Sequence, residues 1–211
     1  MKTIHLIIAL TLTLNASATD NKYIEQMTKN IQAVYQAQTP EQYQDAINAF
    51  ERIAASEKDK WEPYYYTAFG YVMLANKEQD TAKKDALLDK ALTAIESGEK
   101  INDKESELVA LEGFVHMIRV TVDPATRGAQ YSRLAFQTYS KAVAMNPENP
   151  RALGFLAQMQ MGTARFMGTA TTEACETAKK ALEKFETYKS ENPLAPKWGK
   201  RTTESLLTQC Q

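Results

Sequence analysis

The chain has 211 residues, with 25 basic and 26 acidic side chains, and 44% of its residues are hydrophobic. This length is enough for one domain with a sizeable core. The formal net charge of −1 gives no indication of nucleic acid or an anionic membrane as a partner.

The first 18 residues have the layout of a secretory signal peptide. Lys2 precedes an uncharged apolar run over residues 4–14, and Ala16-Ser17-Ala18 forms an A-x-A cleavage site. The alternative is a transmembrane anchor, but this run is shorter than the roughly 20 apolar residues that a span needs. We therefore predict cleavage after Ala18 and export to the periplasm or the exterior. No later stretch is apolar enough to span a bilayer.

The mature part of the chain, residues 19–211, is predicted to be almost entirely helical. Apolar residues recur at helical spacing, helix-end signals separate the runs, and strictly alternating β-branched runs are absent. For example, Thr39 is a candidate N-cap with Pro40 in the first turn and Gln42 three residues on. The predicted helices span residues 21–38, 41–56, 62–76, 81–97, 103–122, 130–146, 150–167, 171–190 and 196–209.

A pattern of small and large residues pairs these helices into hairpins. Two antiparallel helices pack closely when small residues lie at their crossing and large residues fill the space beside it. Ala135 and Ala142 are the small positions of one helix, Tyr139 is its large residue, and Pro147 ends it. The pattern continues in the next helix with Leu153, Leu156 and Ala157.

This pattern resembles the tetratricopeptide repeat (TPR). An alanine followed four positions later by a large residue recurs at Ala46, Ala91, Ala135 and Ala181, at intervals of 45, 44 and 46 residues. The standard repeat has about 34 residues, so we expect longer helices and longer hairpin tips. A HEAT or armadillo array is the alternative, but short turns between hairpins favour TPR. The resemblance implies a right-handed α-solenoid of about four lengthened TPR-like hairpins plus a C-terminal capping helix.

The mature chain also resembles small exported TPR-like proteins of the Bacteroidetes group. The matching stretches are residues 61–66 with Ala68, residues 149–151, residues 162–168 and the end from Cys175 to Cys210. This resemblance covers almost the whole chain and implies a helical-repeat fold in the cell envelope. It implies no activity and no functional residues.

Cys175 and Cys210 are the two cysteines of the chain, and we predict that they form a disulfide. An even count in an exported protein favours pairing. Both cysteines lie at the same end of the predicted eighth and ninth helices, which would be antiparallel. A bridge there would add roughly 2–4 kcal/mol to the free energy of unfolding. The alternative is a pair of free thiols.

No catalytic constellation is recognisable in the sequence. It has no supported Ser-His-Asp or Cys-His arrangement, no G-x-G-x-x-G and no P-loop. His116 is the one histidine of the mature chain and falls at a packing position, so a zinc site lacks ligands. We therefore predict a protein that is not an enzyme and that has no metal or cofactor. A chemical role of His116 and a hydrolase activity are the remaining alternatives.

The first helices of a TPR array line its concave face, so the resemblance implies a groove for a partner. The candidate partner-binding residues are Tyr65, Phe69, Val72, Phe114, Met117, Gln158, Met161 and Arg165. An aromatic and methionine-rich groove with an arginine edge suits a peptide or an amphipathic helix. Alternatively, these side chains pack against a neighbouring helix or the hairpin tips.

Two short motifs, residues 123–128 and 162–168, lie at the lengthened ends of hairpins. Asp123, Arg127 and Arg165 could form a polar binding site there, or they could simply end helices and brace the tips. The leading hypothesis is a non-catalytic exported scaffold that binds a protein or peptide. The alternative is a small-molecule-binding or accessory subunit that uses these tip residues.

Overall fold

The computed structural model describes the backbone of residues 5–210 and the side chains of residues 20–210. The described residues form nine helices and no strand. These are α1 (His5–Gln36), α2 (Pro40–Ser56), α3 (Glu62–Lys77), α4 (Thr81–Glu99), α5 (Ser106–Val122), α6 (Pro124–Met145), α7 (Pro150–Met167), α8 (Thr172–Thr187) and α9 (Lys200–Leu207). The predicted signal peptide lies outside the described side chains. Within the described part, no helix is both long enough and apolar enough to span a membrane.

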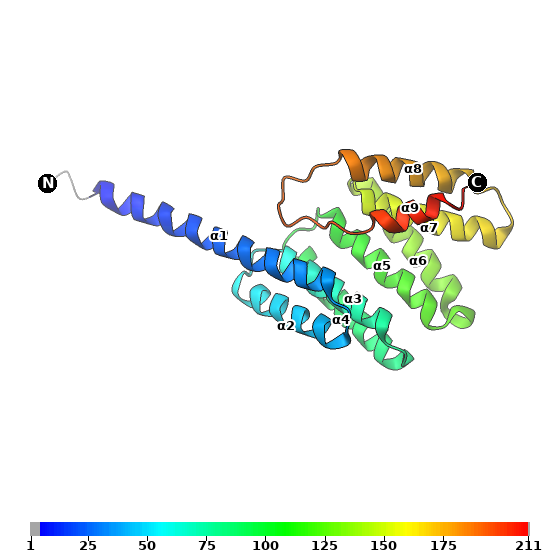
Figure 1. Ribbon diagram of the computed structural model, residues 1–211, viewed down its shortest axis with the longest axis horizontal. Coiled ribbons are helices and arrows are strands. Elements are labelled where there is room, and N and C mark those ends of the chain that lie inside the picture. The colour runs from blue at the N-terminus through cyan, green and yellow to red at the C-terminus, as the bar shows by residue number, and fades with distance from the viewer. Residues whose placement is uncertain (1–4, 211) are drawn as a thin grey trace.

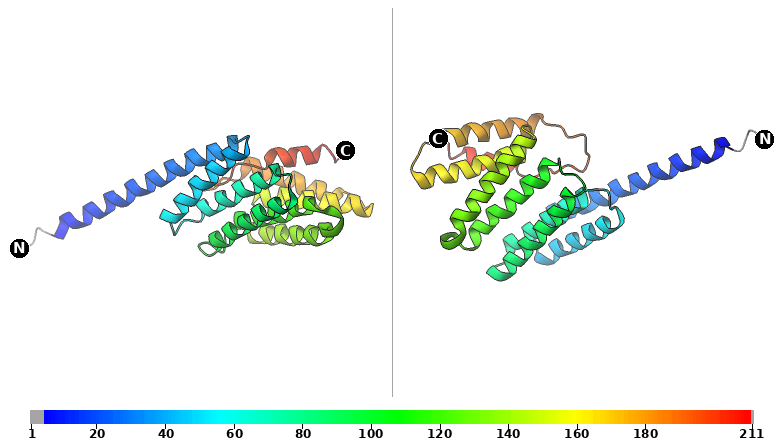
Figure 2. Two further views of the ribbon diagram at one scale, coloured as in Figure 1. Left: turned by 90° about the horizontal axis from the view of Figure 1, so that it is seen from below. Right: turned by 180° about the vertical axis from the view of Figure 1, so that it is seen from behind.

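The helices pair into four hairpins that stack along one axis (Figure 1). The first helices form a continuous layer, because α1 packs on α3, α3 on α5 and α5 on α7. The second helices α2, α4 and α6 each pack between their own partner and the first helix of the next hairpin. The short α9 lies against α7 and α8 (Figure 2). The predicted all-α solenoid with a C-terminal helix is confirmed.

Side-chain caps and prolines set where several helices begin. Thr39 and Gln42 form the predicted capping box, in which each side chain accepts a hydrogen bond from the other's backbone N–H. Asn149 caps α7 by accepting from the backbone N–H groups of Arg151 and Ala152 at 3.0 and 3.1 Å. These caps account for the agreement between predicted and observed helix starts in α2 and α7.

The prediction of long hairpin tips is wrong, because the residues beyond the standard repeat length extend the helices instead. Only Asp123 separates α5 from α6, and α6 begins at Pro124 rather than near Gln130. The Asp123 carboxylate accepts a hydrogen bond from the backbone N–H of Thr126 at 3.2 Å, and Pro124 occupies the first turn. Proline is favourable at this position, since the first N–H groups of a helix have no intrahelical acceptor.

Glycine and alanine allow the close helix crossings that the repeat pattern predicted. Tyr139 of α6 is fully buried, and a Cβ added at Gly113 of α5 would lie 2.7 Å from its ring atom Cε1. Ala135 and Ala142, one turn on either side of Tyr139, are also fully buried. The ring of Tyr139 therefore fills the space that the missing Gly113 side chain leaves.

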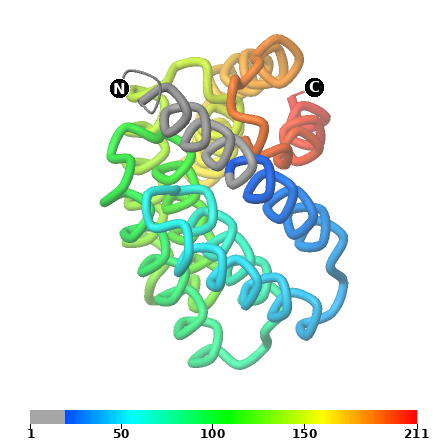
Figure 3. The backbone as a smooth tube through the Cα atoms, turned by 90° about the vertical axis from the view of Figure 1, so that its left-hand side faces the viewer, coloured from blue at the N-terminus to red at the C-terminus, as the bar shows by residue number. Residues whose placement is uncertain are grey.

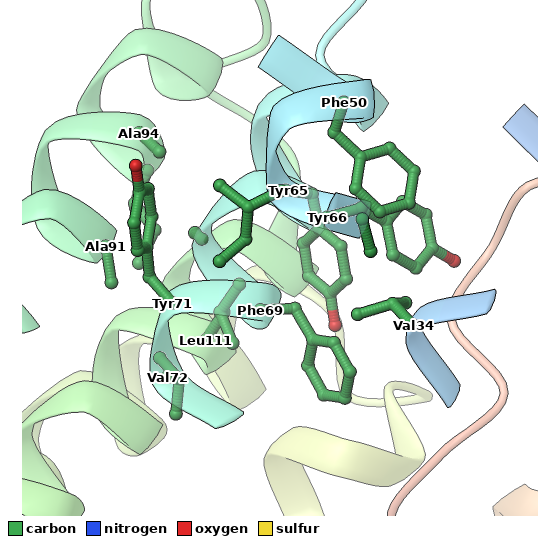
Figure 4. Packing of buried hydrophobic residues seen from close by; sticks show 14 of the residues in the cluster. Val34, Phe50, Tyr65, Tyr66, Phe69, Tyr71, Val72, Ala91, Ala94 and Leu111 are labelled. Atoms are coloured by element: carbon green, nitrogen blue, oxygen red, sulfur yellow. The ribbon is translucent and has the colours of Figure 1, made fainter. Parts of the chain in front are cut away.

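The largest part of the core lies around α3. Figure 4 shows Tyr65, Tyr66 and Phe69 projecting from α3 among side chains of the neighbouring helices. Tyr66 stacks on Phe50 of α2, with ring centroids 5.4 Å apart. The tyrosine-rich α3 is therefore buried on most of its circumference rather than on one stripe.

The predicted disulfide is present between Cys175 and Cys210, with a Cα–Cα distance of 5.8 Å. It joins the first turn of α8 to the residues that follow α9. Cys175 lies in a small apolar cluster with Ala157, Met161 and Leu206, so the bridge and this cluster attach the end of α9 together.

Substitution of Gly113 by alanine should destabilise the fold by about 1–3 kcal/mol, because the buried Tyr139 ring has little space to move away. Urea unfolding followed by circular dichroism measures this change. Gly128→Ala is the matched control: it lies inside α6, and a Cβ there meets nothing within 4 Å. That control should be stabilised by roughly 0.5–1 kcal/mol. Equal effects of the two substitutions would contradict the packing argument.

Candidate functional site

The N-terminal half of the predicted groove is closed in this structure. Tyr65, Phe69 and Val72, three of the expected partner-binding residues, are buried in the core. Tyr35 of α1 meets Phe69 edge to face, with ring centroids 5.7 Å apart. The expectation that these three residues line an open surface is therefore wrong, because α1 and the C-terminal part of the chain cover them.

The segment between α8 and α9, residues 188–199, crosses the inner face of the array and is called here the crossing segment. It runs close to α1 (Figure 3), where the backbone N–H of Lys197 donates to the Tyr35 hydroxyl at 3.1 Å. The Tyr66 hydroxyl donates to the carbonyl of Leu194 at 2.6 Å. Leu194 itself is buried within the main core, so the segment is part of the folded interior.

Trp198 lies near the end of the crossing segment and fills the middle of the groove. Its indole N–H donates to the Tyr65 hydroxyl at 2.9 Å. Its ring lies 5.0 Å from Phe69, 5.4 Å from Phe114 and 5.5 Å from Phe155, measured between centroids. Phe114, another expected partner-binding residue, therefore already packs against the Trp198 ring of its own chain.

A buried ion pair holds the backbone beside Trp198. Arg151 of α7 binds Glu107 of α5 through two hydrogen bonds of 2.7 and 2.5 Å, and also donates to the Trp198 carbonyl at 3.3 Å. Burial alone would lower the pKa of Arg151, but the Glu107 carboxylate outweighs it and raises that pKa above its ordinary value. Arg151 is therefore a permanent cation that links α5, α7 and the crossing segment.

The last helix begins later than predicted, because the packed crossing segment continues to Gly199. We predicted a helix from Pro196, whereas α9 begins at Lys200. Gly199 has a φ of +101°, a left-handed conformation that favours glycine, and it turns the chain from the crossing segment into α9. A Cβ at Gly199 would also lie 3.2 Å from Cγ of Arg151.

The C-terminal half of the array contains a cleft of about 1410 Å³, bounded by α5, α6, α7 and α9. This volume exceeds the roughly 300–1,000 Å³ of ordinary small-molecule pockets. Its apolar lining comprises Met117, Val120, Pro124, Ala125, Ala129, Met159, Met161, Phe166, Met167 and Leu206. A large apolar ligand could be accommodated there without displacing the core.

Small residues on α6 and α7 keep the cleft wide. Added Cβ atoms at Gly128 and Gly162 would meet nothing within 4 Å. At its mouth, the side chains of Phe166 and Met167 are 93% and 67% exposed. Two adjacent large apolar residues so exposed at the edge of a cleft are typical of a binding surface.

Arg165 and Arg201 are the two ionisable side chains among the described residues that line the cleft, and no acidic residue is among these described residues. Within the described chain, neither arginine has a carboxylate partner, whereas Arg119, Arg127 and Arg151 are all paired with acids. The two cleft arginines can therefore bind carboxylates of a ligand.

These arginines lie toward opposite ends of the cleft. Thr203, two residues after Arg201, packs against Gly154 near the beginning of α7. Arg165 is eleven positions further along α7, which corresponds to about 16 Å of helix rise. A ligand could therefore meet one arginine at either end.

Four predicted partner-binding residues do share this cleft: Met117, Gln158, Met161 and Arg165. The predicted polar tip site is not assembled as one set. The Asp123 carboxylate caps α6, and Arg127 binds Asp85 at 2.6 Å on the side of α4. The sequence analysis did not single out Arg201 and Ser205, which also line the cleft.

His116 is placed for packing rather than for chemistry at the cleft. Its ring stacks on Tyr131, with centroids 6.2 Å apart, and its Nε2 lies 3.4 Å from the Glu112 carboxylate. It does not line the cleft. In the part of the chain with described side chains, no three histidine, cysteine or acidic residues come together as a metal site.

No protein-family model matches the chain, and no curated protein matches it. Among solved structures, it is similar to the HusA haemophore from Porphyromonas gingivalis, with 27% identity and a TM-score of 0.79 over 90% of this chain and 92% of that one. It is also similar to a thermophilic TPR protein of Thermus thermophilus, with 19% identity and a TM-score of 0.58 over 94% and 97% of the two chains. The latter likeness shows the fold alone. The chain is thus a TPR-like helical-repeat protein that resembles a haemophore of the Bacteroidetes group.

Proposed function

We propose that this chain is a non-catalytic exported binding protein whose cleft takes up a large, flat, apolar ligand with carboxylate groups, of the porphyrin class to which haem belongs. The observation that carries this proposal is the wide apolar cleft with two arginines that have no acidic partner in the described chain. The similarity to a haemophore over nine-tenths of the chain supports the same class of ligand.

The lining of the cleft suits the porphyrin ring better than its metal. Histidine, cysteine and tyrosine are the strong protein ligands of haem iron, and none of them is among the described residues that line the cleft. Met117, Met159, Met161 and Met167 supply weaker thioether sulfurs and adaptable apolar surface. The ring would be held by apolar contacts and its carboxylates by arginine, so metal-free and iron-containing porphyrins should bind with similar affinity.

The proposed location outside the cytoplasm has two supports besides the predicted signal peptide. Disulfides persist in oxidising compartments, and the Cys175–Cys210 bridge joins the end of α9 to α8. The similar solved structure is a haemophore. Binding of a ligand outside the cytoplasm is consistent with both observations.

Gly128→Leu should weaken protoporphyrin IX binding by at least about tenfold, because the leucine side chain would occupy the space that the ring needs. Fluorescence titration of the mature protein with protoporphyrin IX, and with haemin in parallel, measures this. Gly128→Ala is the matched control and should bind nearly as well as the parent. Both variants should keep the parent's helicity, since position 128 meets no neighbour. Unchanged affinity in Gly128→Leu would exclude this cleft as the site.

Arg165→Gln and Arg201→Gln should each lower the affinity by up to about fivefold. The effect is modest because both arginines are exposed, and exposed ion pairs contribute roughly 0.2–1 kcal/mol. The loss should shrink at high salt. Arg52→Gln, an exposed arginine on α2, is the control. With protoporphyrin dimethyl ester, which lacks free carboxylates, all three variants should match the parent; a persisting loss would contradict carboxylate recognition.

A protein or peptide partner is a second candidate function, favoured by the exposed Phe166 and Met167 beside the cleft. Crosslinking capture in the native envelope, followed by mass spectrometry, tests it. The double variant Phe166→Asp with Met167→Asp should lose a specific partner and keep its helicity, because neither side chain is buried. Phe136→Asp, at a partly exposed position on α6 outside the cleft lining, is the control. Identical capture by parent and double variant would count against a partner at this surface.

A further inference from the structure

One wall of the cleft is formed by α9, and this helix depends on contacts with the rest of the chain to stay folded in place. α9 has 8 residues, and with the residues that follow it contributes Arg201, Ser205, Leu206 and Gln209 to the cleft. A helix this short is not stable in water by itself. What holds its two ends therefore decides whether the cleft is complete.

The beginning of α9 is held by many contacts. Trp198 is packed among aromatic rings, Thr203 packs against Gly154, and Lys200 forms an ion pair with Glu186. None of these interactions involves the cysteines. The beginning of α9 should therefore stay in place whatever the oxidation state of the disulfide.

The end of α9 is held in a different way. Among the described residues, the side-chain hydrogen bonds and ion pairs of residues 201–210 stay within this segment or return to Gly199 and Lys200 directly before it. The apolar contacts of Leu206 and Leu207 with Ala157, Met161 and Ala178 remain, together with the Cys175–Cys210 bridge. The bridge is thus the strongest attachment of this end.

We infer that the Cys175–Cys210 disulfide is a redox-sensitive closure of the cleft, so that reduction by a dithiol frees the end of α9 and releases the ligand. This inference rests on the proposed function, since it assumes that the cleft binds a ligand. The main core around α3 includes Leu194 and Trp198 but no described residue after them. The repeat array should therefore stay folded while the wall opens.

The position of the bridge allows the reaction. Cys210 is half-buried, whereas Cys175 is buried at 9% exposure, so we place the attack of the dithiol at Cys210, the less buried of the two residues. One thiolate of the dithiol bonds to Cys210, and the Cys175 sulfur leaves as a thiolate and takes up a proton. The second thiol of the dithiol then displaces the Cys210 sulfur, which is protonated in turn. Two electrons and two protons reach the protein, and the reductant leaves as a disulfide.

Hydrogen exchange tests the opening without reference to any ligand. The mature protein is compared in the oxidised form, after dithiothreitol treatment with the free thiols counted, and as the Cys175→Ser, Cys210→Ser double variant. Exchange of the backbone amides of residues 205–209 should accelerate in the reduced form and in the double variant, while those of α3 and α5 keep their protection. Unchanged exchange at 205–209 would overturn the inference, and so would a general loss of protection in α3 and α5.

Titration with protoporphyrin IX tests the release. Reduction should weaken binding by about tenfold, because the ligand loses the contacts of Leu206 and its neighbours, and reoxidation should restore it. The double variant should bind weakly and ignore dithiothreitol. If the oxidised protein binds and reduction changes nothing, the closure is overturned and the proposed function stands. If the oxidised protein does not bind, the proposed function and the ligand release that depends on it both fail, and the exchange result alone decides whether reduction opens the wall.

Discussion

The packing of Trp198 into the inner face of the array is the interaction on which the rest of the structure depends. Four aromatic side chains from α3, α5 and α7 surround its ring or accept its N–H: Tyr65, Phe69, Phe114 and Phe155. Because the crossing segment must reach this position, it covers the surface where a TPR array would otherwise receive a peptide. The crossing segment therefore occupies the position where a bound peptide would lie. Open binding surface remains further along, between α5, α6, α7 and α9.

The Arg151–Glu107 pair makes this arrangement specific. A buried ion pair adds little net stability, because removing two charges from water costs about as much as their attraction returns. Its geometry has a larger consequence here. The same guanidinium that binds Glu107 also donates to the Trp198 carbonyl, so the spacing of α5 and α7 and the path of the crossing segment are set together. Loss of either charge would leave the other buried and unpaired, which is far more costly than never having had the pair.

The architecture was predictable because it follows from local patterns, and four of the predicted partner-binding residues line the cleft, but the closed half of the groove was not predictable. A helix crossing can be predicted from residue size alone, as at Ala135, Tyr139 and Ala142. A helix start can be predicted from a side chain that caps it, as at Thr39. Local patterns could not show that Phe69 is covered, since this depends on its contact with Trp198, more than a hundred positions away. Trp198 and the prolines before it were a usable signal. A bulky aromatic at the end of a proline-containing stretch, Asn192 to Trp198, suits an extended, packed segment better than the first turn of a helix.

The length of the repeats explains why a cleft exists beside a filled groove. With about 34 residues per repeat, the hairpins would end soon after the helix crossings that the small residues mark. Here the helices continue for further turns, and the lining from Met117 to Gly128 and from Gln158 to Met167 comes largely from these turns. The lining residues on α6 are mostly small, namely Ala125, Gly128, Ala129 and Ser132, so the extended helices do not fill the space between them. The crossing segment closes the part of the array near the crossings, the additional turns create a second concave surface beyond it, and α9 completes that surface. Repeat length, rather than any single motif, therefore sets the position and the size of the candidate site.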